Sequence, residues 1–455
     1  MTSWEQASRR CDRLVRKAQR DHRIPALTAA VARADRPLWT AEVGLAERDV
    51  PVTADHQFRI GSVTKTFTAV LVMQLRDQGR LDLDDALDRH LPVPAHGDVT
   101  VRTLLTHMSG LQREIPGDVW DTLQFPTIEQ LIGDLARAER VSKRGRRWHY
   151  SNLGFILLGE LASRLRGAAW GELVTDRILR PLEMRRTTLA PVAPVATGYL
   201  VDAYSDHARP EPPMAAEQGA LGAAGQLWST VTDLATWARF LAAPDPAVLA
   251  PETLDEMCQP QTIRDPDDWR VGWGLGLILV PQRSGETQPG ASRVVHVGHD
   301  GAMPGYLAGV YARRADGVGA VALGSSGTAG ETNQLPHALI AESLDADPPD
   351  IEPWVPGDPA PAELADVLGP WWSEGSEFVF SWHHGHLQAR AREAPAEQPP
   401  AVFAHVDGDV YRVASGREAG EALRLTRGAD GRVSVMHWAG YPVTRSQQTF
   451  GASNG

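Results

Sequence analysis

The chain is organised around residues 58–69, which read Phe58-Arg59-Ile60-Gly61-Ser62-Val63-Thr64-Lys65-Thr66-Phe67-Thr68-Ala69. They contain Ser-x-x-Lys at the start of a predicted helix, residues 62–78. Because residues three apart on a helix share a face, the Lys65 amine is expected beside the Ser62 hydroxyl. A serine hydroxyl becomes a nucleophile when a neighbour takes its proton, and a lysine with a lowered pKa can do this. The same spacing also occurs on ordinary surface helices, so the motif needs partners elsewhere in the chain.

Two further stretches offer such partners. One reads Trp148-His149-Tyr150-Ser151-Asn152-Leu153-Gly154-Phe155, with a predicted helix from Leu153. Alone, Asn152 is interpreted as a helix cap and Tyr150 as a packed aromatic residue. The other, between predicted strands at 294–297 and 307–312, reads Gly298-His299-Asp300-Gly301-Ala302-Met303-Pro304-Gly305-Tyr306. Such a glycine-rich strand edge lets a substrate backbone approach closely.

With these three motifs in this order, residues 20 to about 345 resemble the class C β-lactamase and penicillin-binding-protein-like family of serine hydrolases. The motifs are Ser-x-x-Lys, Tyr-x-Asn and His-x-Gly, the last in place of Lys-Thr-Gly. The resemblance implies an α/β fold, with an antiparallel sheet flanked by helices and a separate helical subdomain. The active site would lie between the sheet and that subdomain.

The resemblance also implies a role for each matching side chain. Ser62 would attack a carbonyl and form an acyl-enzyme, while Lys65 and Tyr150 would share the proton transfers. Asn152 would hold Lys65 and the substrate amide, and His299 would orient the substrate or Tyr150. Because lactamases of this class have lysine where this chain has His299, and histidine is usually neutral near pH 7, a dedicated β-lactamase is disfavoured.

The remaining site residues are expected to act through backbone N–H groups or to contact the substrate. The resemblance implies an oxyanion hole made by the N–H groups of Ser62 and Ala302, with Gly301 at the substrate. Residues 112–126 form an irregular, partly aromatic segment. From that segment, Trp120 and Phe125 are expected to border a pocket and to bind substrate.

The C-terminal part has a different composition. Six prolines occur within residues 348–361, which predict a stiff linker. Short alternating segments then recur between turn residues, which indicate a small antiparallel barrel. We therefore expect a catalytic domain at 1–347, a linker at 348–361 and a β domain at 362–455. That domain resembles the lipocalin-like domain attached to some family members, including the penicillin-binding-protein-type thioesterases of nonribosomal peptide pathways.

The resemblance to that subgroup implies a stand-alone thioesterase that macrocyclises a peptidyl thioester with a D-residue at the acyl position. A peptidyl carrier protein is then a possible partner. The alternative is an esterase or a D-amino-acid amidase or peptidase. A β-lactamase and a non-catalytic binding protein fit less well, the latter because Ser62, Lys65, Tyr150 and Asn152 are all present.

Charge and composition narrow the class of protein. The 455 residues carry a net charge of −12, which argues against nucleic acid and anionic membrane as partners. The sequence has no apolar run long enough to span a bilayer and no signal peptide. With two cysteines there is no disulfide framework, so a cytoplasmic protein is expected. No cofactor and no metal are expected.

Four other features have a structural and a functional interpretation. His107 is interpreted as a structural histidine bonded to backbone rather than a base. The acidic residues at 82–88 are interpreted as a solvated turn rather than a calcium site. The segment His383-His384-Gly385-His386 is interpreted as a hairpin turn rather than a metal site. The glycines at 272, 274 and 276 lack dinucleotide-binding spacing and predict a strand packed against another backbone.

Overall fold

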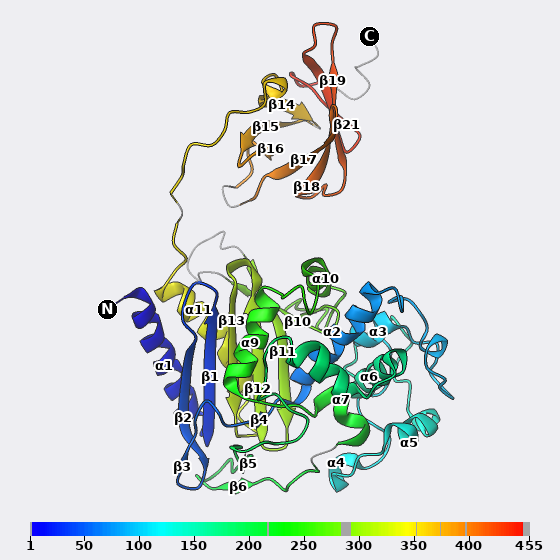
Figure 1. Cartoon of the computed structure of the whole chain (residues 1–455), viewed down its shortest axis with the longest axis vertical. Coiled ribbons are helices and arrows are strands. Elements are labelled where there is room, and N and C mark those ends of the chain that lie inside the picture. Colours follow the sequence, from blue (N-terminus) through cyan, green and yellow to red (C-terminus); the bar gives the residue numbers. More distant parts are fainter. Residues whose placement is uncertain are drawn as a thin grey trace. The chain divides into compact units, whose positions relative to one another are not determined.

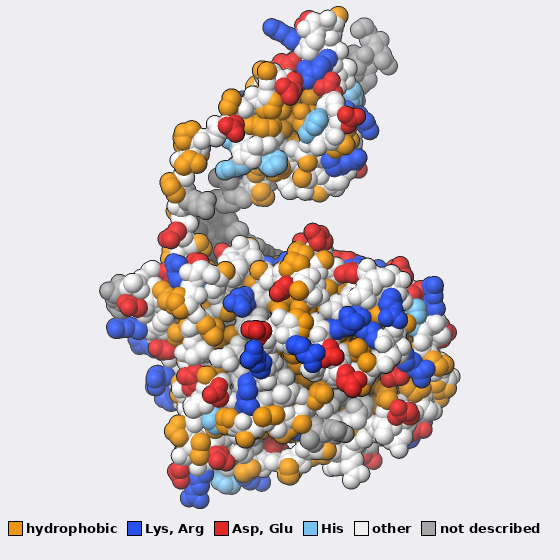
Figure 2. All heavy atoms as spheres, in the orientation of Figure 1, with side chains coloured by type: hydrophobic (Ala, Val, Ile, Leu, Met, Phe, Trp, Pro, Cys, Tyr) orange, Lys and Arg blue, Asp and Glu red, His pale blue; other side chains and the backbone are white. Residues whose placement is uncertain are grey.

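The computed structural model describes residues 2–215, 218–283, 293–351, 353–373, 375–395 and 398–448. The chain divides into two compact units, Met1–Pro349 and Asp350–Gly455 (Figure 1). The end of the predicted β domain, residues 449–455, lies outside the described residues. No helix in the described part of the chain is long and apolar enough to cross a membrane. On the face shown in Figure 2, acidic and basic side chains are interspersed over the first unit.

The first unit is built on a nine-stranded sheet in which every described neighbouring pair is antiparallel. The predicted strands before and after the His299 motif both belong to it. In spatial order the strands are β3 (Val50–Pro51), β2 (Trp39–Glu47), β1 (Ala26–Arg33), β13 (Val318–Gly324), β12 (Tyr306–Arg313), β11 (Arg293–Met303), β10 (Ile278–Arg283), β9 (Gly272–Trp273) and β8 (Thr262–Ile263).

Helices cover both faces of this sheet. On one face α9 (Val231–Ala242) packs against β1, β12 and β13. On the other, α1 (Ser3–Asp21) and α11 (Glu331–Ala346) pack against each other and against the sheet (Figure 1). Helix α1 buries a stripe at Ala7, Cys11, Val15 and Ala18, the amphipathic spacing expected for one covered face. Two separate apolar cores result, one on each side of the sheet.

Beyond the β8 edge, a mainly helical region shares the α9-side core. Its two longest helices, α2 (Thr64–Asp77) and α6 (Asn152–Arg166), are buried on several sides. Its helices are α2 (Thr64–Asp77), α3 (Val101–Leu105), α4 (Val119–Thr122), α5 (Ile128–Gly133), α6 (Asn152–Arg166), α7 (Trp170–Val174), α8 (Gly222–Gly225) and α10 (Pro251–Met257). The short pairs β4 (Phe58–Arg59) with β7 (Trp228–Ser229), and β5 (Tyr199–Val201) with β6 (Ala208–Pro210), complete the unit.

The second unit is an antiparallel meander of eight described strands. Trp372 and Thr444 exchange backbone hydrogen bonds of 2.7 and 2.9 Å, which nearly closes the meander into a barrel around its own apolar core. The strands are β14 (Gly369–Ser373), β15 (Ser376–His383), β16 (His386–Ala391), β17 (Ala401–Asp407), β18 (Val410–Ser415), β19 (Ala422–Arg427), β20 (Val433–Trp438) and β21 (Tyr441–Val443). The prediction of an α/β unit followed by a small all-β barrel is confirmed.

Two local predictions are confirmed by the described residues, and the acidic segment is partly buried rather than fully solvated. His384 and Gly385 form the turn between β15 and β16, with positive φ at both, so the hairpin interpretation is confirmed. Gly274 lies where a Cβ would be 2.0 Å from Met257 O, which confirms close backbone packing. In the acidic segment, Asp85 pairs with Arg89 and His90. No group of three or more metal-ligating side chains is found among the described residues.

Candidate active site

Ser62 lies in a tight turn directly before α2. The pairing of β4 with β7 fixes the approach to a 3₁₀ turn, Gly61–Val63, which runs directly into α2. Gly61 has φ +49°, and a Cβ there would be 2.7 Å from Ala302 N. Only glycine allows both this φ and this contact. The predicted helix at 62–78 is therefore confirmed, with its first turn tightened against β11.

The Lys65 amine lies 2.9 Å from Ser62 Oγ, as the three-residue spacing predicts. It also donates to Ala224 O at 2.8 Å, so α8 holds it in place. Lys65 is fully buried, and burial lowers its pKa well below the usual value for lysine. Glu114 opposes this shift and Arg113 adds to it. A neutral amine in contact with Ser62 can accept the serine proton.

Tyr150 lies at the entry to α6. The α6 cap is Ser151, whose Oγ accepts from Gly154 N at 3.1 Å; Asn152 is already inside the helix. Burial raises the pKa of Tyr150, although a hydrogen bond with Ser62 partly offsets this, so its hydroxyl is protonated near pH 7. Lys65 Nζ lies 5.1 Å from the Tyr150 ring centroid. The three side chains thus form one connected group.

His107 contacts this group through Ser151 and the Tyr150 ring. Its Nδ1 accepts a hydrogen bond of 3.0 Å from Ser151 N, and its ring centroid lies 4.3 Å from that of Tyr150. Burial and the nearby Lys65 lower the pKa of His107 well below its usual value. The interpretation of His107 as a structural histidine bonded to backbone is confirmed.

Asn152 has a different partner from the one expected. Its Nδ2 donates to both carboxylate oxygens of Glu114, at 2.8 and 2.9 Å, and makes no hydrogen bond to Lys65. Its Oδ1 is buried without a partner among the described residues, and the expected bond from Asn152 to a substrate amide stays a prediction. The expectation that Asn152 holds Lys65 is therefore wrong. Asn152 donates to Glu114, and the charge of Glu114 acts on Lys65. Sequence reasoning missed Glu114, whose one signal was its place in the irregular segment 112–126.

His299 lies on β11 and is almost completely buried. Its Nδ1 donates to Asp300 O, which leaves Nε2 as a lone-pair acceptor with no partner among the described residues. Burial first, and the nearby Lys65 second, lower the pKa of His299 to about 3. His299 is therefore neutral at pH 7, and its ring centroid lies 6.4 Å from that of Tyr150.

Gly301 and Ala302 bring β11 against the Ser62 turn. A Cβ on Gly301 would lie 1.9 Å from Ile60 O, so only glycine lets the strand approach this closely. The need for glycine thus comes from the protein's own backbone, although Gly301 also lines the cavity. Ala302 N lies beside Gly61, next to Ser62. The oxyanion role of the Ser62 and Ala302 N–H groups stays a prediction.

A cavity of about 360 Å³ is lined by Ser62, Tyr150 and His299, whereas Lys65 and Asn152 are not part of its lining. Trp148, Tyr150 and Trp273 give it aromatic walls, and their ring centroids lie 5.3 to 6.3 Å apart. It also contains charged side chains that sequence reasoning did not assign to the site. The lining consists of Ser62, Arg113, Trp148, His149, Tyr150, Arg264, Trp273, Ile278, His299, Asp300, Gly301, Ala302 and Asn333.

Trp120 and Phe125 lie outside this lining. Their rings meet edge to face at 5.6 Å, and Phe125 borders a separate cavity of about 350 Å³ near Ile115 and Leu131. They therefore do not contact the Ser62 cavity, and a substrate contact by either residue stays a prediction.

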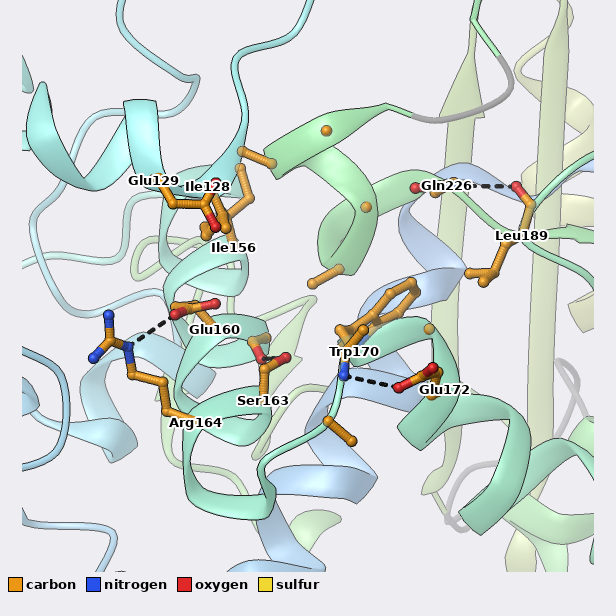
Figure 3. A pocket seen from close by; sticks show the side chains of 18 of the residues that line it. Ile128, Glu129, Ile156, Glu160, Ser163, Arg164, Trp170, Glu172, Leu189 and Gln226 are labelled. Carbon is orange, nitrogen blue, oxygen red and sulfur yellow. Dashed lines mark hydrogen bonds and ion pairs between the residues drawn. The ribbon is translucent and has the colours of Figure 1, made fainter.

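A larger cavity, of about 720 Å³, lies between α6, α7 and α8 (Figure 3). Trp170 forms part of its wall and donates from Nε1 to Thr68 Oγ1 at 3.0 Å. Thr68 in turn donates to Ala223 O, one residue before the carbonyl that holds Lys65. This cavity lies behind α8, and Ser62 is not part of its lining.

Comparison with protein families agrees with this geometry. The family model described as Beta-lactamase matches residues 11–345, and one described as a domain of unknown function matches residues 360–445. Penicillin-binding protein 4 of Amycolatopsis lactamdurans is 28% identical over 78% of this chain and 95% of its own length. Beta-lactamase-like protein 2 of Dictyostelium discoideum is 28% identical over 59% of this chain, which spans about half (52%) of that relative.

Two solved structures are similar to this chain, each at 27% sequence identity. SurE is 27% identical with a TM-score of 0.62, and the alignment covers 98% of this chain and 100% of SurE. A D-stereospecific amidohydrolase from Streptomyces sp. is 27% identical with a TM-score of 0.60, over 72% of this chain and 98% of its own. The octameric penicillin-binding protein homologue from Pyrococcus abyssi, at 21% identity and a TM-score of 0.63, shares the fold.

Proposed function

The chain belongs to the Beta-lactamase family of serine hydrolases, and on this premise we propose that it is an enzyme that forms an acyl-enzyme on Ser62. The observation that carries the proposal is the 2.9 Å approach of a fully buried lysine amine to the Ser62 hydroxyl, inside a cavity that Tyr150 also lines. A decayed, non-catalytic site would have no reason to keep a buried amine in this position, because burial of an ionisable group is costly.

The geometry supports the following steps. Ser62 Oγ bonds to the acyl carbon while its proton passes to neutral Lys65. The N–H groups of Ser62 and Ala302 stabilise the oxyanion; one such donor is worth about 3 kcal/mol in other enzymes. The proton reaches the leaving group through the Tyr150 hydroxyl as the bond between the acyl carbon and the leaving group breaks, which leaves the acyl group on Ser62. Water or an amine then bonds to the acyl carbon, the bond to Ser62 breaks, and Ser62 regains a proton.

Intact-mass spectrometry tests this step. A fluorophosphonate or an activated ester should add once to the full chain and not at all to Ser62→Ala. An adduct that persists in Ser62→Ala would assign the nucleophile elsewhere and overturn the proposal.

For the substrate we propose a peptidyl thioester with a D-residue at the acyl position, released mainly as a macrocycle. Two observations and one general argument support this choice. SurE is similar over nearly the whole length of both chains, and the structure of SurE with D-Leu is also similar, with a TM-score of 0.56. Neutral His299 lacks the fixed positive charge that would favour a β-lactam carboxylate. The amine of a tethered peptide also gains a high effective concentration over an external acceptor.

The proposed substrate suggests a protein partner for this enzyme. A peptidyl carrier protein would deliver the thioester. We also propose that the reaction takes place in the cytoplasm.

The second candidate is a D-amino-acid amidase or a small-ester esterase. The similarity to the D-stereospecific amidohydrolase favours it, and the 360 Å³ cavity is large enough for a single amino-acid derivative. Chromatography with mass spectrometry separates the two functions. Peptide thioesters that end in a D- or an L-residue should give mainly cyclic product from the D-series. Linear acid from every peptide, with faster turnover of small esters and amides, would establish the second candidate instead.

A further inference from the structure

Asp300 contributes an acidic side chain to the Ser62 cavity that the steps above do not use. Asp300 Oδ1 accepts a hydrogen bond of 3.0 Å from the Tyr311 hydroxyl. The second carboxylate oxygen has no hydrogen-bond partner among the described residues. Tyr311 therefore fixes the carboxylate in place and leaves one oxygen for a ligand.

Asn333 adds a second oxygen acceptor at the same place. Gly309 is the cross-strand partner of Asp300, and a Cβ at Gly309 would be 3.1 Å from Asn333 O. The missing side chain thus lets the start of α11 rest on the sheet beside Asp300. Asn333 lines the Ser62 cavity, and its Oδ1 is buried without a partner within the described part of the chain. A buried acceptor left without a donor costs free energy, which a bound donor would recover.

The distance from the reacting centre suits a substrate group. Asp300 precedes Ala302 by two residues on β11, so the two side chains lie on one face of the strand, about 7 Å apart. The α-ammonium of an amino-acid derivative, two bonds from the acyl carbon, or a waiting amine nucleophile can reach a carboxylate over such a distance through a hydrogen bond.

We propose that Asp300 and Asn333 form a subsite for a primary amine of the reacting molecule, in its ammonium form when bound. The proposal rests on the acyl-enzyme function of Ser62 and specifies its substrate. A carboxylate oxygen and an amide oxygen, both fixed and both acceptors, match the three donors of an ammonium group. The amine belongs either to the acyl donor, as in an amino-acid amide, or to the acyl acceptor that attacks the ester.

The charges around Asp300 set the conditions for binding. Arg113, Arg264, His149, His299 and Tyr150 share the cavity with it, and Tyr311 contacts it from β12. Burial raises the pKa of Asp300 to about 6, against the Tyr311 hydrogen bond and the charge of Arg264. The carboxylate is therefore mostly ionised at pH 7. The two arginines would instead favour an anionic substrate, which gives the experiment its opposing outcome.

Binding and turnover of matched ligands test the subsite in the full chain. D-Phenylalanine methyl ester carries an ammonium, its N-acetyl form is neutral and its N-succinyl form is anionic. The wild type should prefer the ammonium form in kcat/KM by at least about tenfold. Asp300→Asn should remove this preference while changing the N-acetyl ester less than about threefold. If the amine is instead that of the acceptor, the N-acetyl donor with added D-phenylalanine amide should lose its aminolysis-to-hydrolysis ratio in Asp300→Asn.

Two further variants and a binding assay keep the proposal falsifiable. Asn333→Leu should weaken and Asn333→Asp should tighten binding of the unreactive amine D-phenylalaninol, measured by calorimetry. The control Asp268→Asn removes an exposed acid paired with Arg270 and should leave binding unchanged. Preference for the N-succinyl ester, equal losses for all three esters, or unchanged D-phenylalaninol binding in Asp300→Asn would overturn the subsite. Absence of a Ser62 adduct would overturn the proposed function instead, and D-phenylalaninol binding would still decide the subsite.

Discussion

The protonation of Lys65 is governed by its burial and by two adjacent residues of opposite charge, Glu114 and Arg113. Glu114 stabilises the ammonium, so Glu114→Gln should lower the pKa of Lys65 further and move the acidic limb of kcat/KM to lower pH. Arg113 destabilises the ammonium, so Arg113→Gln should move that limb to higher pH. The sign follows because the neutral amine is the active form and is lost as pH falls through its pKa. Profiles with a small neutral ester measure both shifts, and equal shifts in one direction would contradict the assignment.

Removal of the Lys65 amine tests its role as the base at the same scale. Lys65→Met keeps the length of the side chain and should lower kcat by about 10²- to 10⁴-fold, the usual range for general base catalysis. The variant loses the hydrogen bond to Ala224 O but no longer buries an ionisable group. These effects oppose each other, so the free energy of unfolding should change by no more than about 2 kcal/mol. Full activity in a folded Lys65→Met protein would exclude the lysine as base.

Some site residues could be predicted because local spacing fixes them. Ser62 and Lys65 are one helical turn apart, and their contact follows from that spacing alone. Tyr150 and His299 were found through short motifs, but nothing local joins them to Ser62. Glu114, Asp300 and Asn333 were missed as site residues because their contacts depend on how distant elements pack. The side-chain amide of Asn152, for example, donates to Glu114, which lies 38 residues away in an irregular loop.

At the scale of elements, the contact between β11 and the Ser62 turn positions the site. Gly301→Ala would place a Cβ 1.9 Å from Ile60 O, against backbone that cannot rotate away. We expect a loss of about 1–3 kcal/mol in stability and a larger loss of activity, because Ala302 N would move from Ser62. Thermal unfolding and ester turnover measure the two effects. Gly133→Ala is the matched control, since a Cβ there would meet no atom within 4 Å beyond its own helix, and it should change neither.

The same strand shows where element prediction stops. The apolar run predicts a strand over residues 294–297, whereas β11 continues to Met303 through three residues of the His299 motif and beyond. Glycines at 298 and 301 weaken the strand pattern in the sequence. In the fold they are required, because Val310 O and Ile60 O lie where their side chains would be. Pairing with β12, which the sequence does not encode locally, keeps the segment extended.

At the scale of the whole molecule, two units have separate cores. The cores of the first unit lie on the two faces of its sheet, and that of the second runs from Leu364 to Val443. The change of composition at the prolines and the alternating segments made this division visible in the sequence. The near closure of the barrel through Trp372 and Thr444 was not, because it joins residues 72 positions apart through backbone groups alone.

This separation allows the role of the second unit to be tested by truncation after Pro349. All residues that line the Ser62 cavity belong to the first unit, so the truncated chain should fold and react with a fluorophosphonate within about twofold of the wild-type rate. If the second unit engages the peptide or its carrier protein, turnover of a peptidyl thioester should fall at least about tenfold while small-ester turnover stays near the wild-type value. Circular dichroism verifies folding. A folded but unreactive truncation would mean that the barrel helps to build the catalytic site, and equal peptide turnover would remove it from substrate binding.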